Sequence, residues 1–493
     1  MSKKAKIAWL YLIAALFVAV ALYFLVSKNN YLFFAVPVVI GILLLYVFSL
    51  DKVMMLISFC VPLSVTLEEF EQLAVSLPAE PLLAGVLILF IAKLLYEGNY
   101  DRNVARHPVS VIIYCMFVWM VVTTITSEMP LVSVKFIASR LWFIVPSFFF
   151  CAILFKRPKN IDWFIWLYIA SLCIVVVYTT INHAAHGFDN DTAHWVMSPF
   201  YNDHTAYGAA LAIYLTLAIT YAFLPGIKAG RRILVLCVIA LLSVAMVLSS
   251  CRAAWVSLAA SLLVLAFVLL KIKFRWILTT FVILLGLFFA FQHQIIDALE
   301  HNSQDASGDV VENIQSITNI STDASNLERI NRWQSAFRLF AERPVFGWGP
   351  GTYQFVYAPY QMSKEKTIIS TNAGDKGNAH SEYIGPLAEQ GVVGFLLVLI
   401  LVITVVYTGL KAYQRAKNKK AKVLVLGATL AFFGYFVHGF LNNFLDTDKL
   451  AVPVWSCAAL IVVIDLYYSR QDTFEEVIQN QPTQPQTTDS SKA

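Results

Sequence analysis

The sequence predicts an all-α polytopic membrane protein with about 12–14 transmembrane helices. Three observations lead to this fold class. The 493-residue chain is 59% hydrophobic and only 14% charged, with a mean hydropathy of +0.68, which soluble domains rarely reach. Apolar runs of about 20 residues recur along the whole chain, and each can cross roughly 30 Å of hydrocarbon. Basic residues gather on alternate loops between these runs.

The apolar runs define 14 expected spans. We place them at residues 7–26, 31–50, 53–66, 81–96, 108–127, 134–155, 161–182, 204–224, 232–249, 251–270, 275–292, 383–408, 423–440 and 451–468. The first is too long for a signal-peptide core, and no small-residue cleavage site follows it. The segment 53–66 is short enough to be re-entrant, and another division of the N-terminal runs gives 12 spans. Either even number puts both termini on the same side.

The loop charges orient the chain. One set of short loops carries most of the Lys and Arg, and the largest group lies between the predicted spans 383–408 and 423–440. The alternate short loops carry few cations. We therefore predict that both termini are cytoplasmic. The net charge of +5 follows from this bias, so it indicates no nucleic-acid partner.

Four regions follow from these spans. We expect a transmembrane bundle over 1–292, a large loop over 293–382 on the outer face, C-terminal transmembrane helices over 383–472, and a disordered cytoplasmic tail over 473–493. Within the loop, helical spacing predicts a helix over Asn326–Arg343. Its expected apolar stripe consists of Leu327, Ile330, Trp333, Ala336, Phe337 and Phe340. Pro344 and the Gly/Pro-rich run that follows should end this helix.

Two arginines are unusually placed. Arg252 lies at a tight turn on the outer face, where it opposes the positive-inside trend. It is either a snorkelling interfacial residue or a functional cation. Arg140 lies about six residues, or roughly 9 Å, inside the span 134–155. A central Arg costs about 2.5–3.5 kcal/mol to insert, so Arg140 requires a structural ion pair, a phosphate or water.

His380 immediately precedes a span at its outer edge. A histidine there can simply cap the helix, but a neutral imidazole can also act as a general base near neutral pH. The expected topology places His204, Arg252, Arg329 and Arg332 on the same face. Arginines bind phosphate oxygens bidentately, so this set suits a lipid-linked sugar diphosphate and a hydroxyl acceptor.

The motifs around these residues resemble those of the O-antigen ligase / O-antigen polymerase family. Leu327–Trp333 and Glu342–Gly351 resemble its Arg-x-x-x-Trp helix and the Pro/Gly turn that follows. His380–Gly394 is similar to its His-Asn/Ser…Glu-x-Gly-x-x-Gly segment, and Ser250–Arg252 to its Ser-Arg turn. Tyr201–His204 resembles a segment in which the family usually has Asn at the position of His204. The resemblance is strongest over residues 200–440.

This resemblance implies a GT-C-like membrane glycosyltransferase of the bacterial inner membrane. Family members move a glycan from undecaprenyl diphosphate without a metal or other cofactor. The acceptor is lipid A–core in ligases and another lipid-linked repeat unit in polymerases. Carried onto this chain, the essential His is His380 and the two essential arginines are Arg252 and Arg329, with Arg332 as an alternative, shifted match. We add Arg140 and His204 as candidate substrate-binding residues.

We therefore predict an inverting, metal-independent ligase at the periplasmic face, with His380 as general base. A polymerase is the main alternative, since it shares these motifs. A lipid-linked glycan flippase or transporter would leave the large outer loop unexplained. A metal-dependent oligosaccharyltransferase would use the Asp-x-Asp runs Asp189–Asp191 and Asp446–Asp448, which can also be plain solvated acids.

Overall fold

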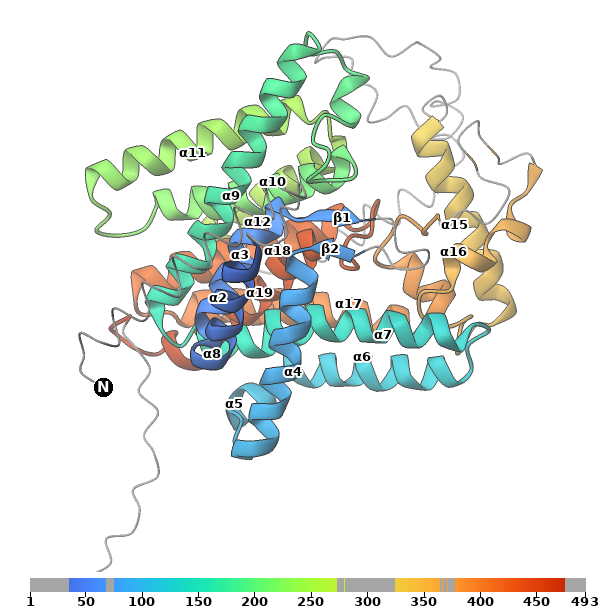
Figure 1. Ribbon diagram of the computed structural model, residues 1–493, viewed down its shortest axis with the longest axis horizontal. Coiled ribbons are helices and arrows are strands. Elements are labelled where there is room, and N and C mark those ends of the chain that lie inside the picture. Colours follow the sequence, from blue (N-terminus) through green and yellow to red (C-terminus); the bar gives the residue numbers. More distant parts are fainter. Residues whose placement is uncertain are drawn as a thin grey trace, which may run out of the picture. The chain divides into compact units, whose positions relative to one another are not determined.

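The computed structural model describes residues 35–67, 75–272, 324–363 and 377–474, together with residues 279, 366 and 370. The chain divides into two compact units, Met1–Leu56 and Ile57–Ala493. The helices and strands are drawn in Figure 1. They are α2 Ala35–Phe48, α3 Leu50–Cys60, β1 Val65–Leu67, β2 Val75–Leu77, α4 Ala79–Glu97, α5 Arg102–Ala105, α6 Pro108–Ile125, α7 Pro130–Ile144, α8 Cys151–Leu154, α9 Pro158–Ala185, α10 His204–Ala222, α11 Ala229–Leu248, α12 Arg252–Leu269, α15 Ala324–Glu342, α16 Tyr353–Val356, α17 Ile384–Arg415, α18 Lys419–His438 and α19 Asp448–Val463.

Ten helices in the described part of the chain are long and apolar enough to cross a membrane. They match ten of the predicted spans one to one, from α4 to α12 and from α17 to α19, so the prediction of an all-α polytopic membrane protein is confirmed. One of them runs from α7 through a π-helical turn, Val145–Phe150, into α8. The predicted span 7–26 and, apart from Thr279, the predicted span 275–292 lie outside the described residues, so the total number of spans stays a prediction.

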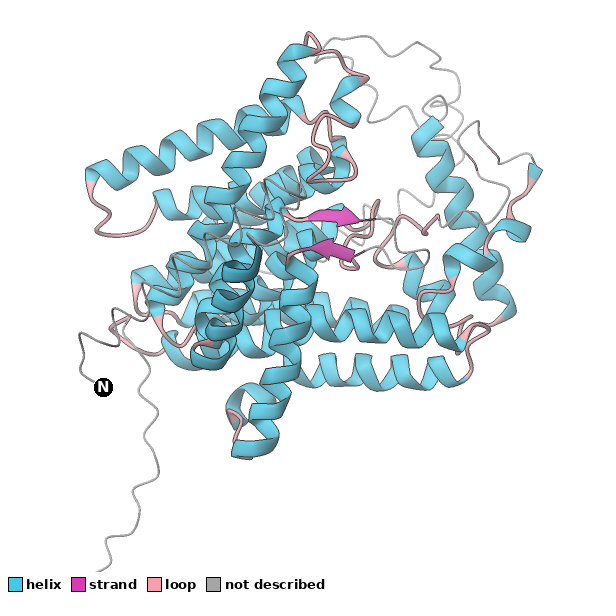
Figure 2. Cartoon of the chain, viewed as in Figure 1, coloured by secondary structure: helices cyan, strands magenta, loops and turns pink. Residues whose placement is uncertain are grey.

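The segment 53–66 does not form a span, so the division of the chain into 14 spans is wrong here, and the alternative of 12 stays a prediction. Helix α3 ends at Cys60, a 3-10 turn over Val61–Leu63 contains Pro62, and strand β1 begins at Val65. Strands β1 and β2 pair antiparallel, with Val65 opposite Leu77 and Leu67 opposite Val75. Figure 2 shows them as the two strands among the described elements. Val and Thr favour an extended chain, and a two-stranded ribbon of this kind gains its stability from packing on neighbouring helices.

Local sequence signals set the helix boundaries. Pro occupies the first position of α6, α7 and α9, where its missing N–H costs nothing. The Asp203 carboxylate caps α10 by accepting from the N–H groups of Thr205 at 2.7 Å and Ala206 at 2.9 Å. Gly98 ends α4 in the left-handed region, at φ 60°.

The spanning helices differ in burial. The share of the span buried within the protein is 78% for α10, 72% for α18 and 83% for the span that begins with α19. The corresponding share is 28% for α6, 28% for α17 and 22% for α12, which carry exposed Leu, Ile and Val side chains. Helices α10, α18 and α19 therefore form the centre of the second unit, and the others cover it with surfaces suited to lipid.

Helix α15 packs on the beginning of α17, and the two helices are seen together in Figure 1. The helix, its end before Pro344 and the Gly/Pro turn agree with the sequence prediction. Its predicted apolar stripe is wrong in part, because Phe337 is 44% exposed. The buried face instead carries Glu328, Asn331, Arg332 and Ser335, each at most 5% exposed. These polar side chains can be buried because they bond to one another and to the adjoining loop.

Candidate functional site

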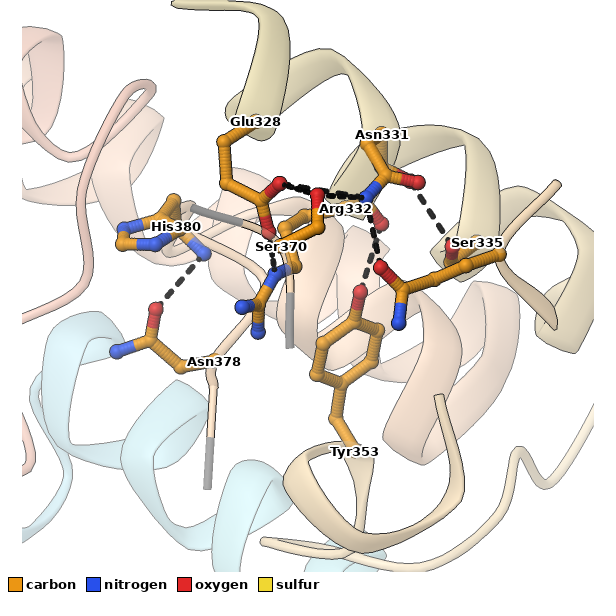
Figure 3. Close-up of polar contacts among 9 residues, drawn as sticks. Glu328, Asn331, Arg332, Ser335, Tyr353, Ser370, Asn378 and His380 are labelled. Atoms are coloured by element: carbon orange, nitrogen blue, oxygen red, sulfur yellow. Dashed lines mark hydrogen bonds and ion pairs between the residues drawn. The ribbon is translucent and has the colours of Figure 1, made fainter. Parts of the chain in front are cut away.

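His380 lies in the turn that leads into α17 and has a left-handed backbone, with φ 47°. This conformation is uncommon for a residue with a side chain. The His380 N–H donates to Asn378 Oδ1 at 3.1 Å, which fixes the turn. Figure 3 shows the imidazole beside Asn378, with the bond made by the backbone rather than by the ring. The ring nitrogens make no hydrogen bond to the described residues, so they remain available to a substrate.

Ser381, rather than His380, provides the side-chain acceptor in the turn that leads into α17. Its Oγ accepts from the N–H groups of Tyr383 and Ile384, both at 3.3 Å. A capping side chain satisfies backbone donors at the start of a helix, and here the neighbouring serine does so. The geometry therefore gives no support to the alternative in which His380 serves as the helix cap.

The surroundings of His380 favour the neutral imidazole. Burial lowers its pKa to about 4, and the positive charges of Arg329 and Arg332 act in the same direction. Asp203 and Glu328 oppose this shift without reversing it. At neutral pH the ring is thus uncharged and able to accept a proton.

The polar face of α15 supports the His380 loop. Arg332 Nε donates to Glu328 Oε1 at 2.6 Å, and Glu328 also accepts from the hydroxyl of Ser370 (Figure 3). Burial opposes ionisation of Glu328, but Ser370 and Arg332 together hold its pKa below the ordinary value. Asn331 extends the network by donating to Gln361 Oε1 at 2.8 Å.

Arg332 is enclosed on several sides. Its guanidinium carbon lies 4.3 Å from the centre of the Tyr357 ring, and Tyr353 donates its hydroxyl to the Arg332 carbonyl at 2.7 Å. A Cβ added to Gly377 would lie 1.4 Å from Arg332 Nη1, so the chain entering the His380 turn rests directly on the guanidinium. Arg332 Nη1 has no hydrogen-bond partner among the described residues. Arg332 thus ties α15 to the segment that carries His380.

Two further predicted residues lie near Arg329. Arg329 Nε donates to the Leu441 carbonyl at 3.2 Å, which joins α15 to the loop after α18. His204 begins α10 within electrostatic reach of both Arg252 and Arg329. Its Nδ1 lies 3.1 Å from Nδ1 of His194. We call His204, Arg252, Arg329 and Arg332 the cationic side of the site.

Glu382 anchors the loop 439–447, which lies next to the cationic side. Its Oε1 accepts from the Tyr435 hydroxyl at 2.6 Å and from the N–H groups of Phe444 at 2.8 Å and Leu445 at 2.9 Å. The Glu382 N–H donates to the Gly439 carbonyl at 2.7 Å, and this backbone bond joins the entry of α17 to the end of α18. One buried carboxylate therefore sets the path of a loop that borders the site.

The Gly/Pro turn packs against a kink in α17. Gly391 leaves the helical conformation at φ 69°, and a Cβ there would lie 2.1 Å from the Val345 carbonyl oxygen. The N–H groups of Trp348 and Gly349 donate to the carbonyls of Ala388 and Glu389 at 3.1 and 2.8 Å. Two motifs that are separate in the sequence thus form one unit, which fixes the first part of α17.

A cavity of about 230 Å³ lies beside the His380 turn. Its charged lining consists of the three carboxylates Glu382, Glu389 and Asp446 and the guanidinium of Arg140. Asn378, Ala379 and Ser381, which flank His380 in the chain, also line it. We call this space the acidic cavity.

Arg140 belongs to the acidic cavity rather than to the cationic side. Its charge acts on both Glu389 and Asp446, and its guanidinium carbon lies 4.8 Å from the centre of the Phe136 ring. Arg140 thus has acidic neighbours for the charge that the sequence places inside a span.

The Asp-x-Asp runs do not form joint cation sites in this arrangement. Asp446 lines the acidic cavity, whereas Asp448 accepts from the Ser64 hydroxyl. The Lys449 ammonium donates to the same Ser64 hydroxyl at 2.7 Å. Asp189 accepts from the N–H groups of its own turn, at Asp191 and Thr192. The described residues contain no group of three or more His, Cys, Asp or Glu placed to hold a metal.

A comparison with protein families decides the broad class. Residues 237–399 match the family model described as O-antigen ligase. This part of the chain is similar to O-antigen ligases. The resemblance stated from the sequence motifs is thereby confirmed. Arg252, Arg329, Arg332 and His380 lie within this matched region, whereas Arg140 and His204 lie outside it.

A protein of Haemophilus influenzae, described as uncharacterized, is 23% identical over 99 residues. The match covers 20% of this chain and 24% of that protein, so the chain spans about a quarter of this relative. The match to the O-antigen ligase family supports, in broad terms, a ligase- or polymerase-like function of the glycosyltransferase type. Together with the ten apolar helices, it indicates a multi-pass inner-membrane protein.

The structure brings most of the predicted residues together. His380 feels the charges of Arg329 and Arg332, and His204 lies within reach of Arg252 and Arg329. Sequence reasoning missed the roles of other residues in this region: Glu328, Asn378, Glu382, Glu389 and Asp446. The i,i+4 spacing of Glu328 and Arg332 could have indicated their ion pair. No local pattern could show that Glu382 holds a loop about 60 residues later in the chain.

Proposed function

We propose that this protein transfers a glycan from an undecaprenyl-diphosphate-linked donor to a lipid A–core acceptor at the periplasmic face of the inner membrane. The observation that carries the proposal is His380, a neutral imidazole with no hydrogen bond from its ring to the described residues, set beside Arg329 and Arg332. A sugar hydroxyl is a poor nucleophile until its proton is removed, and a neutral imidazole can accept that proton. The match to the O-antigen ligase family supports this reaction class.

In the proposed reaction, the acceptor hydroxyl attacks the anomeric carbon of the donor sugar while His380 takes its proton. The bond from the anomeric carbon to the diphosphate oxygen breaks, and its electron pair leaves with undecaprenyl diphosphate. Arg252 and Arg329 offset the charge that develops on this leaving group. One displacement of this kind inverts the anomeric configuration.

The other candidates take supporting roles in this proposal. Arg332 is already paired with Glu328 and stacked over Tyr357, so we assign it mainly to positioning the His380 segment. His204 borders the diphosphate site through Arg252 and Arg329. The separate partners of Asp446 and Asp448 support a metal-independent reaction, in which arginines take the place of a cation.

The proposed topology places both termini in the cytoplasm and the large loop in the periplasm, and the basic-loop asymmetry supports it. A reporter fused after Lys420 should read cytoplasmic, and one fused near Thr322 should read periplasmic. The reverse result at either position would contradict a periplasmic site.

The lipopolysaccharide of a deletion strain tests the proposed function. Loss of a ligase should leave core-only lipid A, with polymerised glycan accumulating on undecaprenyl diphosphate. Core bearing a single repeat unit would instead identify a polymerase, which carries the same family motifs. Purified protein should transfer the glycan in EDTA, and loss of transfer that Mg²⁺ or Mn²⁺ restores would overturn the metal-independent mechanism.

A further inference from the structure

The acidic cavity and the cationic side are adjacent, but one carries mainly carboxylates and the other mainly arginines. The loop 439–447 contacts both regions. Its Leu441 carbonyl accepts a hydrogen bond from Arg329, and its residues Asn443, Leu445 and Asp446 line the cavity. None of the residues of the cationic side lines the cavity. The two neighbours of His380 in the chain, Ala379 and Ser381, do line it. The His380 turn therefore stands between two regions of different electrostatic character.

The charges of the cavity disfavour a phosphate. Three carboxylates share the wall with one guanidinium, and a diphosphate brought among them would face like charges. Asp446 is an exposed residue of this wall, and although burial raises the pKa of its carboxyl to about 6, the group is ionised at neutral pH. Carboxylates accept hydrogen bonds from hydroxyl and amine groups, which sugars carry in abundance.

Two buried polar atoms in the same wall lack partners. Asn443 Oδ1 and Trp455 Nε1 have no hydrogen bond among the described residues, and Trp455 is only 2% exposed. Asn443 Oδ1 is an acceptor and Trp455 Nε1 is a donor, and a sugar hydroxyl can act as both donor and acceptor. A buried polar atom without a partner is costly, so a ligand that pairs with both, after a small shift of the side chains that cover them, would gain affinity.

The size and the other lining residues limit the ligand. A volume of about 230 Å³ is below the roughly 300–1,000 Å³ of pockets that hold drug-sized ligands, so the cavity suits one sugar ring rather than an oligosaccharide. Phe136 and Phe436 add aromatic surface. A few polar groups on a largely apolar wall are typical of a site that orients a small ligand.

We propose that the acidic cavity is the acceptor-sugar subsite, which selects an uncharged or amino sugar over a uronic or phosphorylated one and turns its hydroxyl toward His380. This proposal rests on the proposed function, because only an acceptor must bring a hydroxyl to the general base. Arg140 balances part of the carboxylate charge, and Asp446 carries the discrimination against anionic sugars.

Two glycosides of the same size and alkyl-chain length test whether the cavity prefers an uncharged sugar to an anionic one, and binding alone is measured, without turnover. The full-length protein in nanodiscs is titrated with octyl glucoside and octyl glucuronide, both below their micellar concentrations, by calorimetry. We expect octyl glucoside to bind about tenfold more tightly than octyl glucuronide. Asp446→Asn should reduce this ratio to about threefold or less, because one repelling charge is removed. Arg140→Gln should widen it, because the carboxylates lose their cation.

Steady-state kinetics then show whether the cavity binds the acceptor or the donor. Asp446→Asn should raise the acceptor KM about tenfold and leave the donor KM unchanged. Glu128→Gln is the matched control, because Glu128 is an exposed carboxylate that pairs with Arg343 at 2.8 Å and does not line the cavity. It should change neither constant. A response to Arg140→Gln opposite to that of Asp446→Asn excludes simple misfolding of the variants.

Equal binding of the two glycosides to the wild type would overturn the subsite, and so would an Asp446→Asn effect on the donor KM alone. Failure of the proposed function has a different signature. The wild type would then transfer no glycan from undecaprenyl diphosphate, whatever the two glycosides show by calorimetry.

Discussion

The two regions that meet at the His380 turn are built in opposite ways. The cationic side collects arginines from α12 and α15, and its acids are already engaged, since Asp203 caps α10 and Glu328 pairs with Arg332. The acidic cavity collects carboxylates from α17 and two adjacent loops around the single guanidinium of Arg140. The difference suggests that charge separates the two substrates, with the donor's diphosphate on one side and the acceptor sugar on the other.

His380 lies between the two regions, so its replacement should have the largest effect. His380→Ala should lower the turnover rate by about 10²–10⁴-fold, because the attacking hydroxyl keeps its proton. Michaelis constants for donor and acceptor should change little, since the ring belongs to neither binding region. Steady-state transfer by purified protein measures all three quantities.

His186→Ala is the control, because His186 bonds to the Asn182 carbonyl of its own helix at 2.8 Å and lies outside the site. A well-folded His380→Ala protein that keeps more than about a tenth of wild-type turnover would rule out the general-base role.

The cationic side should be sensitive to geometry as well as to charge. Arg252→Lys and Arg329→Lys should each lower transfer by about 10–100-fold, because an ammonium cannot form the planar fork that matches two phosphate oxygens. The loss should appear as weaker binding of undecaprenyl diphosphate, with the acceptor KM unchanged. Near wild-type transfer by both variants would mean that only positive charge matters there. Arg157→Lys, an exposed position before α9, controls for the exchange itself.

The pH profile should reveal how the cationic side acts on His380. The base must be neutral, so kcat/KM should fall as the pH drops through the pKa of about 4 set by burial and by Arg329 and Arg332. Arg329→Gln removes a positive charge beside the ring, so the pKa should rise and the acid limb should move up by on the order of half a pH unit. An acid limb near the ordinary histidine value of about 6.5 in the wild type would show that the ring is not held neutral in this way.

The smallest effect should come from the helix cap. Ser381→Ala removes the acceptor for two N–H groups at the start of α17 and should lower the free energy of unfolding by about 1 kcal/mol. Transfer should fall only a few-fold at the growth temperature. Thermal unfolding of the purified protein measures the first quantity. A loss of transfer as large as that of His380→Ala would mean that Ser381 takes part in the reaction itself.

The fold was predictable from the sequence because each span carries its own signal. Helices α6, α7 and α9 begin at a proline, and the spans that start with them, of 18, 25 and 28 residues, are long enough to cross a bilayer. The break after Cys60 was harder to place, since Pro62 and the β-branched residues that follow also fit an apolar span. The buried face of α15 was missed for a physical reason. Hydrophobic periodicity finds apolar stripes, whereas Asn331 and Ser335 are buried through hydrogen bonds.

The site was predictable only in part. Arg252, Arg329 and His380 stood out because each is unusual where it occurs in the sequence. Arg140 was expected to need a partner, but the sequence could not show that its acidic neighbours are Glu389 and Asp446. Contacts of this kind join residues hundreds of positions apart, and only the folded chain determines them.

The kink at Gly391 has a consequence for how the protein assembles. A helix that bends within a membrane releases backbone groups that must find other partners, at several kcal/mol for each group left unpaired. Here the Gly/Pro turn supplies them, through Trp348, Gly349 and the Pro344 carbonyl, which accepts from Val392 N–H at 2.9 Å. The entry of α17 therefore cannot reach its final form before the turn docks. We therefore expect insertion of this helix into the bilayer and completion of the site to be separate events, with the second dependent on a segment that lies outside the spanning helices.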